Sequence, residues 1–266
     1  MTKLLLVGCG KMGGALLAGW LDNGMPAGNI VVADPAGAPG RLENGVLCIA
    51  DAGGLPGGFV PDVVVLAVKP QMMDKAAPAY AGFAGQAVFL SIAAGKTIGY
   101  YQKMFGPKVA VVRAMPNTPA AARRGMTVMV ANSAVTPEQR RLCNSLLSAV
   151  GEVAQVEDEA LIDAVTAVSG SGPAYVFLLA ETLAQAGVEA GLPADLAQRL
   201  ARVTVAGSGA LLAREDADAA QLRRDVTSPQ GTTAAALDVL MGEGGFAPLL
   251  SRAVAAAAKR SRELAG

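Results

Sequence analysis

Six residues near the start of the chain have the types and spacing needed to bind a phosphate group through the backbone. They are Gly8, Cys9, Gly10, Lys11, Met12 and Gly13, and they match the pattern G-x-G-x-x-G. In that pattern the first glycine makes a tight turn, the second lets the backbone approach a pyrophosphate, and the third lets a helix lie close to a sheet. The segment predicts a dinucleotide-binding loop, and the alternative is a tight turn without a ligand.

An acidic residue, Asp34, follows the apolar run Ile30–Ala33, which predicts a strand. At the end of the second strand of a dinucleotide-binding unit, an aspartate can bind a ribose hydroxyl. It suits NADH there, because its charge repels the 2′-phosphate of NADPH. The alternative is that Asp34 caps the turn at Pro35.

Three further loops follow apolar, β-branched runs that predict strands at Val63–Val68, Ala87–Ile92 and Val109–Ala114. In an open α/β sheet, ligands bind beyond the carboxyl ends of the strands, so we expect these loops to line one crevice with the glycine loop. Lys69 either binds a phosphate or ribose or is a solvated turn residue, and Asn117 either positions a nicotinamide or caps its turn. The predicted cofactor contacts in these loops are Ala67, Val68, Lys69, Pro70, Ala93, Ala94, Gly95 and Asn117.

Two small-residue turns, Ser169–Tyr175 and Thr227–Thr233, each lead into a helical pattern. Both present hydroxyl groups and free N–H groups at a helix start, which can receive a small carboxylate. The alternative is helix capping by serine and threonine. Capping needs one hydroxyl, whereas Thr227–Thr233 carries four.

Two kinds of apolar periodicity divide the chain and indicate the strands and helices that carry these segments. Up to residue 157, short apolar runs alternate with helical patterns, which predicts an α/β Rossmann domain with a mostly parallel sheet. From residue 158 to residue 266 the patterns are helical, which predicts an all-α domain whose Ala-rich helices suit an oligomer interface. The expected helices are Leu161–Val168, Ala174–Glu189, Pro193–Leu212, Thr233–Leu240 and Ala247–Leu264.

Composition excludes several classes of function. The 266 residues include no histidine, so a histidine acid–base catalyst of the lactate or malate dehydrogenase type is impossible, and no metal site is expected. The net charge is zero without a basic block, so we expect no nucleic-acid partner. The three cysteines form no disulfide framework, no secretory signal pattern is present, and the apolar stretch Ala174–Ala180 is short for a membrane span, which together predict a cytoplasmic protein.

Three longer segments resemble the signatures of pyrroline-5-carboxylate reductases. They are RAMPNTPA at 113–120, AVSGSGPAYVFLLAE at 167–181 and DVTSPQGTT at 225–233, and the GCGKMG and AVKP segments match in order and spacing. The resemblance implies reduction of 1-pyrroline-5-carboxylate to L-proline with NADPH or NADH, the last step of proline synthesis. It also implies a homodimer formed through the C-terminal helices, with a decamer as a further assembly.

The resemblance also implies roles for residues of the helical domain. Thr233 matches the threonine that hydrogen-bonds the pyrroline nitrogen, and the segment from Ser228 to Thr233 matches the loop whose backbone holds the substrate carboxylate. The substrate-binding residues are then Ser171, Ser228, Gly231, Thr232 and Thr233. Two alternatives stay open: a reductase of a related cyclic imine, and a regulator that senses NAD(P) without catalysis.

Two residues depart from the family pattern. Asp34 stands where members that prefer NADPH tend to have residues less hostile to the 2′-phosphate, and the other departure lies in the substrate loop. The family usually has two glycines after the proline of the 227–233 loop, and here Gln230 replaces the first of them. If that position needs a positive φ, glutamine raises the conformational energy of the folded loop by about 1 kcal/mol or more.

Overall fold

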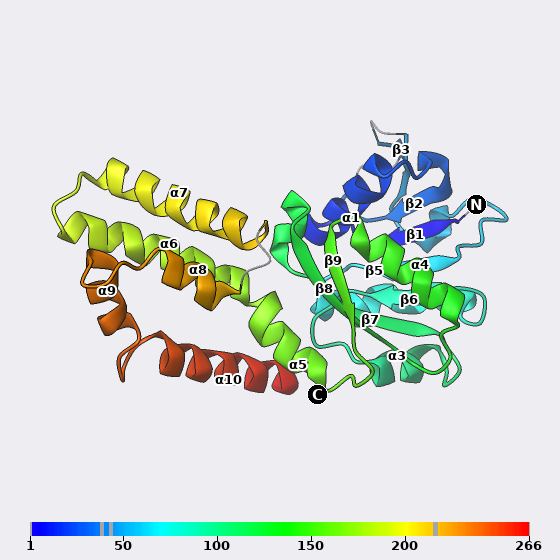
Figure 1. The fold of residues 1–266 in the computed structure, drawn as a ribbon. Coiled ribbons are helices and arrows are strands. Elements are labelled where there is room, and N and C mark those ends of the chain that lie inside the picture. Colours follow the sequence, from blue (N-terminus) through cyan, green and yellow to red (C-terminus); the bar gives the residue numbers. More distant parts are fainter. Residues whose placement is uncertain (1, 38–39, 43–44, 215–217, 266) are drawn as a thin grey trace. The chain divides into compact units, whose positions relative to one another are not determined.

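The computed structural model describes residues 2–37, 40–42, 45–214 and 218–265 (Figure 1). The chain forms two compact units, residues 1–170 with 258–266, and residues 171–257. The first unit carries the sheet and the second is helical, so the predicted succession of an α/β domain and a helical domain is confirmed.

The described part of the first unit contains a nine-stranded sheet in the order β3-β4-β2-β1-β5-β6-β7-β8-β9. Its pairs are parallel except for β3–β4 and β7–β8, as expected for a mostly parallel sheet. The strands are β1 (Leu4–Val7), β2 (Ile30–Ala33), β3 (Gly40–Arg41), β4 (Leu47–Ile49), β5 (Val63–Leu66), β6 (Val88–Ser91), β7 (Val111–Met115), β8 (Gly125–Ala131) and β9 (Gly151–Gln155).

Helices cover both faces of this sheet, which explains why its central strands are continuous apolar runs. On one face, α1 (Lys11–Asp22) and α4 (Pro137–Ser148) contribute Leu16, Trp20 and Leu146 to the core. The Trp20 indole N–H donates to the Leu146 carbonyl over 2.9 Å and joins the two helices. On the other face lie α2 (Met73–Ala76), α3 (Ile98–Phe105) and α5 (Leu161–Val165).

The structure adds elements that the sequence patterns did not predict. They are β3, β4, α2, α3 and α8 (Ala219–Asp225). These elements are short, and short segments show too few periods to be recognised. In α3, the Thr97 hydroxyl caps the helix by accepting the Tyr100 N–H over 3.2 Å.

The division between the units falls after Gly170, whereas the sequence predicted a boundary between residues 157 and 158. The physical reason is that α5 packs on the sheet. Its Ile162 is fully buried in the core, and Glu159 just before it accepts a hydrogen bond from the Arg113 guanidinium over 2.8 Å. The end of α10 returns to the same unit, where the Ser261 hydroxyl donates to the Asp163 carboxylate over 2.6 Å.

The second unit consists mainly of helices with few buried residues. The helices are α6 (Gly172–Glu189), α7 (Ala194–Leu212), α8, α9 (Thr232–Leu240) and the larger part of α10 (Phe246–Ala265). Helices α6 and α7 pack closely side by side (Figure 1), and a Cβ atom added at Gly187 would lie 3.2 Å from the Ala197 Cβ. Large apolar side chains stay exposed, among them Phe177 at 67% and Val239 at 76%. An exposed apolar surface of this kind marks an interaction site.

The helical run Leu161–Glu189 is long and apolar enough to cross a membrane, judged by length and composition alone, because one 18-residue window has a mean hydropathy of 1.3. It combines α5, a π-helical turn at Thr166–Gly170 and α6, and therefore exceeds the stretch Ala174–Ala180 that the sequence analysis considered too short. A helix that packs against a second protein passes the same test. The absence of a membrane partner stays a prediction.

Candidate functional site

The glycine loop lies at the switch point of the sheet, where β1 has β2 on one side and β5 on the other. The Gly8 N–H donates to the Ala33 carbonyl at the end of β2 over 2.8 Å. Gly8 has a φ of 91°, and an added Cβ would lie 2.8 Å from the Val68 side chain and 3.0 Å from the Ala67 backbone. Gly13 sits against the Gly8 carbonyl, so both glycines allow close approach of α1, β1 and the loop after β5.

Gly10 differs from these two glycines because a Cβ added there would meet nothing within 4 Å. It is exposed and is the N-cap residue of α1, whose start has no side-chain cap among the described residues. No acidic residue occupies the first turn of the helix either. The loop therefore offers open space next to a helix start whose first N–H groups have no side-chain cap in the described residues, which fits a dinucleotide pyrophosphate.

Asp34 binds the backbone of two segments. One carboxylate oxygen accepts the Cys9 N–H over 2.6 Å, and the other accepts the Ala36 N–H over 2.9 Å. Asp34 therefore caps the turn that contains Pro35, as one of the two alternatives predicted, and the N–H that it accepts belongs to Ala36. The contact with Cys9 also holds the carboxylate beside the glycine loop, where its charge faces the site expected for the ribose.

The remaining strand ends gather on the same edge of the sheet. The Ala67 N–H donates to the Val7 carbonyl over 2.8 Å, and the Ile92 N–H donates to the Leu66 carbonyl over 3.2 Å. The segments Ala67–Pro70 and Ala93–Gly95 consequently follow adjacent parallel strands, as predicted. Lys69 is exposed and precedes a short helical turn that begins with Pro70. This position agrees with both interpretations, a contact with phosphate or ribose and a solvated turn residue.

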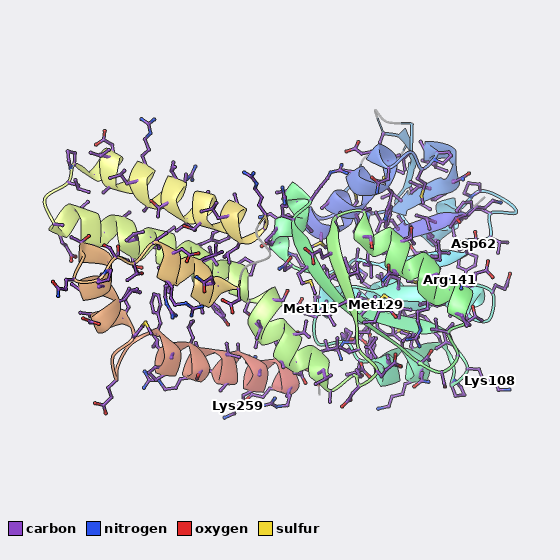
Figure 2. The ribbon with its side chains drawn as sticks, in the orientation of Figure 1. Asp62, Lys108, Met115, Met129, Arg141 and Lys259 are labelled. Atoms are coloured by element: carbon purple, nitrogen blue, oxygen red, sulfur yellow. The ribbon has the colours of Figure 1, made fainter. Side chains whose placement is uncertain are left out.

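Asn117 joins two segments that are far apart in the sequence. Its amide nitrogen donates to the backbone and side-chain oxygens of Ser169, each over 3.2 Å, and its amide oxygen accepts the Met126 N–H over 2.8 Å. Met115, labelled in Figure 2 at the end of β7, lies against Gly170, where an added Cβ would run into the methionine methyl group. Asn117 therefore holds the π-helical turn before α6, and a direct contact with a nicotinamide remains a prediction.

Buried polar residues that sequence reasoning missed support this edge of the sheet. The Arg113 guanidinium is nearly inaccessible and pairs with Glu159, which also accepts the Ile98 N–H over 2.8 Å. The Ser91 hydroxyl lies 2.6 Å from the Tyr101 hydroxyl and accepts the Ala93 N–H over 3.2 Å. An arginine within the apolar run VVRAM was the available signal for the first pair, since a buried charge needs a partner.

The substrate residues predicted from the sequence lie in the second unit. The turn before α9 is closed by the Gly231 N–H, which donates to the Ser228 carbonyl over 3.1 Å. The start of α9 has Gly231 as its N-cap and no side-chain cap among the described residues. Helix α6 likewise lacks a side-chain cap from its N-cap residue, Ser171. The capping explanation for these hydroxyl-rich turns is therefore not realised at either described helix start.

Gln230 has a φ of 59°. The sequence did not decide whether position 230 needs a positive φ. The structure shows this conformation at Gln230, the residue that replaces a family glycine. Gly231 beside it leaves no room for a side chain, because an added Cβ would meet the Ser228 hydroxyl.

The thiol groups are poor nucleophiles at neutral pH. Burial raises the pKa of Cys9, and the nearby charge of Asp34 raises it further. Burial raises the pKa of Cys143 to about 12. The described residues contain no cluster of three or more cysteine or acidic side chains suited to a metal ion.

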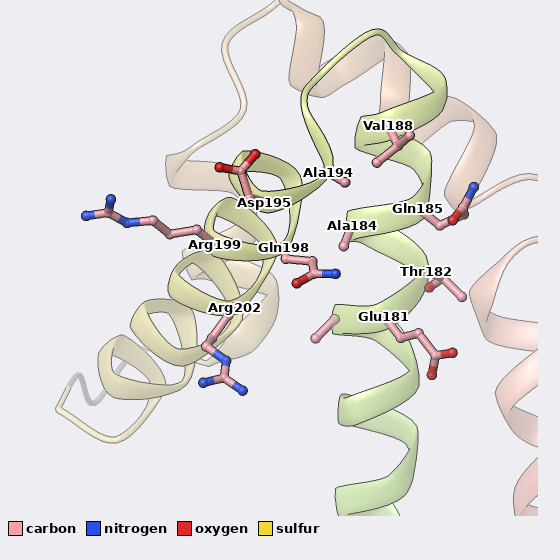
Figure 3. A pocket seen from close by; sticks show the side chains of 11 residues that line it. Glu181, Thr182, Ala184, Gln185, Val188, Ala194, Asp195, Gln198, Arg199 and Arg202 are labelled. Atoms are coloured by element: carbon pink, nitrogen blue, oxygen red, sulfur yellow. The ribbon is translucent and has the colours of Figure 1, made fainter.

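A groove of about 990 Å³ is present in the second unit (Figure 3). It lies between α6 and α7, and its polar lining includes Glu181, Asp195, Gln198 and Arg202. None of the predicted cofactor or substrate residues lines it.

Two family models match the chain over separate segments. One is described as pyrroline-5-carboxylate reductase dimerisation and matches residues 159–264. The other is described as NADP oxidoreductase, coenzyme F420-dependent, and matches residues 3–95, which contain the glycine loop, Asp34 and the loops after β5 and β6.

Similar proteins match over nearly the full chain. A pyrroline-5-carboxylate reductase from Synechocystis sp. is 42% identical over 98% of both chains, and one from Pseudomonas aeruginosa is 40% identical over 99% of this chain and 97% of that protein. Among solved structures, the pyrroline-5-carboxylate reductase of Coxiella burnetii has a TM-score of 0.90 and 34% identity over 100% of this chain and 99% of that one. The Plasmodium falciparum enzyme with NADP bound has a TM-score of 0.84 and 28% identity over 100% and 98%.

Proposed function

The chain belongs to the pyrroline-5-carboxylate reductase family, and on this premise we propose that the glycine loop binds the nicotinamide nucleotide and that the 227–233 loop binds the substrate. The protein is an NAD(P)H-dependent oxidoreductase that reduces 1-pyrroline-5-carboxylate to L-proline, the final step of proline biosynthesis.

The nucleotide site consists of residues that fit its phosphate and ribose groups. The N–H groups at the start of α1 bind the pyrophosphate, and Gly10 leaves the space for it. Asp34, held by the Cys9 and Ala36 N–H groups, accepts a ribose hydroxyl. When bound, the reduced nicotinamide supplies a hydride to the imine carbon of the substrate.

The substrate site consists of the uncapped start of α9. Backbone N–H groups of the loop from Ser228 to Thr233, above all those of Thr232 and Thr233 at the helix start, bind the carboxylate, because no side chain caps this helix start in the described residues. The Thr233 hydroxyl hydrogen-bonds the ring nitrogen, which is already protonated when the C=N bond becomes a C–N bond. Ser171 contributes a further polar group to the substrate.

This chemistry explains why a chain without histidine can catalyse the reaction. A cyclic imine is basic enough to be protonated before hydride arrives, so the enzyme needs no strong buried acid. Its main task is to orient the imine carbon toward the hydride donor, and proximity of this kind supplies much of the rate enhancement.

The observation that carries the proposal is the hydroxyl-rich, uncapped start of α9, since a module that only senses NAD(P) does not need it. The test is a steady-state assay of NADH and NADPH oxidation with pyrroline-5-carboxylate, and with smaller and larger cyclic imines. We expect turnover with pyrroline-5-carboxylate at the highest kcat/KM. Nucleotide binding without turnover would support the regulator instead.

The helical unit is a dimerisation domain. We propose that two copies bury the exposed apolar side chains of α6, α7, α9 and α10, which account for most of the exposed large apolar residues. Assembly of dimers into a decamer and a cytoplasmic location complete the proposal. Size-exclusion chromatography with light scattering tests the assembly.

A further inference from the structure

The last turn of α10 packs directly against the turn that follows β6. Gly95 in that turn has a φ of 73°, and a Cβ added there would lie 3.0 Å from the Leu264 carbonyl oxygen and 3.4 Å from the Leu264 Cβ. Both residues belong to the first unit. The backbones therefore approach so closely that a side chain at Gly95 would have to displace the end of α10.

A buried hydrogen bond anchors this end of the helix. Ser261 is 6% exposed, and its hydroxyl donates to the Asp163 carboxylate on α5 over 2.6 Å. Hydrogen bonds to a charged acceptor are among the stronger ones. Ser261 thus fixes the position of the helical turn that carries Leu264.

Helix α5 is also held beside the segment that follows β6 and contains Gly95. Glu159 at its start accepts the Ile98 N–H and pairs with the buried Arg113. Ile98 begins α3, immediately after the turn that contains Gly95. The segment between β6 and α3 is therefore held at its α3 end by Glu159 and at Gly95 by the end of α10.

We propose that the last turn of α10, residues 261–264, is a positioning element for the nucleotide loop Ala93–Gly95. Ser261 and Asp163 act through this loop as positioning residues. The inference rests on the proposed function, because the nucleotide-binding role of Ala93–Gly95 is part of it. Loss of the anchor lets the loop move away from the nucleotide and weakens nucleotide binding more than substrate binding.

The test compares Ser261→Ala, Asp163→Ala and Asp163→Asn in the full chain. Calorimetry gives the Kd for NADH and for NADPH, and steady-state assays give the KM for nucleotide and for pyrroline-5-carboxylate. We expect Ser261→Ala and Asp163→Ala to raise the Kd and KM for nucleotide by about three- to tenfold, which lies within the range for residues that modulate a site indirectly. Asp163→Asn retains an oxygen that accepts the Ser261 hydroxyl and is expected to stay near wild type.

Two further variants separate positioning from general stability. Ser148→Ala is the matched control, because the hydrogen bonds of this exposed serine among the described residues stay within α4, to the Asn144 carbonyl and, at a longer distance, to the Asn144 side chain. It is expected to leave the Kd unchanged. Deletion of residues 262–266 removes Leu264 but retains the Ser261–Asp163 bond, and it is expected to weaken nucleotide binding as Ser261→Ala does.

Wild-type nucleotide Kd in Ser261→Ala, Asp163→Ala and the deletion would overturn the inference and leave the proposed function intact. Equal increases in the KM for nucleotide and in the KM for pyrroline-5-carboxylate, in proportion to a loss of Tm, would also overturn the inference. Such a result would indicate a general structural role for these residues. A wild-type protein that binds nucleotide without reducing pyrroline-5-carboxylate would contradict the proposed function, while the Kd comparison would still decide the inference. A wild-type protein that binds neither nucleotide would overturn both.

Discussion

Replacing Gln230 by glycine should stabilise the protein, although it removes a side chain. Gln230 has a φ of 59° and is exposed, so its side chain contributes little packing. A left-handed conformation costs an L-residue about 1–2 kcal/mol, and glycine avoids this cost. Glycine loses about 0.5–1 kcal/mol through the greater entropy of the unfolded chain. The free energy of unfolding should therefore rise by roughly 0.5–1 kcal/mol on balance.

The assay is equilibrium unfolding in urea and thermal unfolding, at one fixed protomer concentration because the protein oligomerises. A chain of this size should gain about 1–4 °C in Tm. Gln71→Gly is the matched control. Gln71 lies in the helical turn Pro70–Met72 and is not among the described residues with positive φ. Glycine there should destabilise by about 0.5–1 kcal/mol.

The two substitutions remove the same side chain and should act in opposite directions. A decrease in stability for Gln230→Gly that matches Gln71→Gly would refute the assignment of backbone strain to residue 230. The KM for pyrroline-5-carboxylate gives an independent readout. Because glycine adopts the same φ without cost, the loop should keep its shape and the KM should stay within about twofold of wild type.

Three further outcomes follow from the site. Asp34→Ser should shift the ratio of kcat/KM values toward NADPH, because it removes a carboxylate that the Cys9 N–H holds beside the ribose site; an unchanged ratio in paired assays would contradict this. Thr233→Ala should keep the Tm and the nucleotide Kd but lower kcat/KM for pyrroline-5-carboxylate by about tenfold or more, since a hydrogen bond to a charged group contributes about 1.5–3 kcal/mol; wild-type kcat/KM would exclude the role. Glu159→Gln should lower the free energy of unfolding by roughly 3 kcal/mol in urea, because it leaves the buried Arg113 without a counter-charge. Glu157→Gln, which breaks an exposed pair with Arg140, should change it by less than about 0.5 kcal/mol, and equal effects of the two would refute the argument from burial.

Most of the fold could be predicted because its signals are local. The strand β2 begins and ends where the apolar run Ile30–Ala33 predicted it, and α9 (Thr232–Leu240) begins one residue before the predicted start at Thr233. The loops predicted to bind the nucleotide could be placed together for a simple reason. The carboxyl ends of adjacent parallel strands meet at one edge of a sheet, whatever the register of the remaining strands.

The partners of individual side chains could not be predicted in the same way. Asn117 was expected to contact a nicotinamide or to cap its own turn, and its additional contact with Ser169 was not anticipated. Arg113 lies in the predicted strand Val109–Ala114, and that pattern did not indicate its pairing with Glu159, which attaches α5 to the sheet. Both contacts join residues more than 45 positions apart, and no local pattern encodes such a distance.

The sequence alone determined the succession of a parallel α/β unit and a helical unit, the glycine loop at the first turn and the hydroxyl-rich turn before α9, because each depends on residues a few positions apart. Only the tertiary structure decided the left-handed conformation of Gln230, the attachment of Asp34 to Cys9, and the return of α10 to the first unit. These features depend on which distant segments pack together. Side-chain burial and backbone approach select that packing, and a one-dimensional pattern does not contain them.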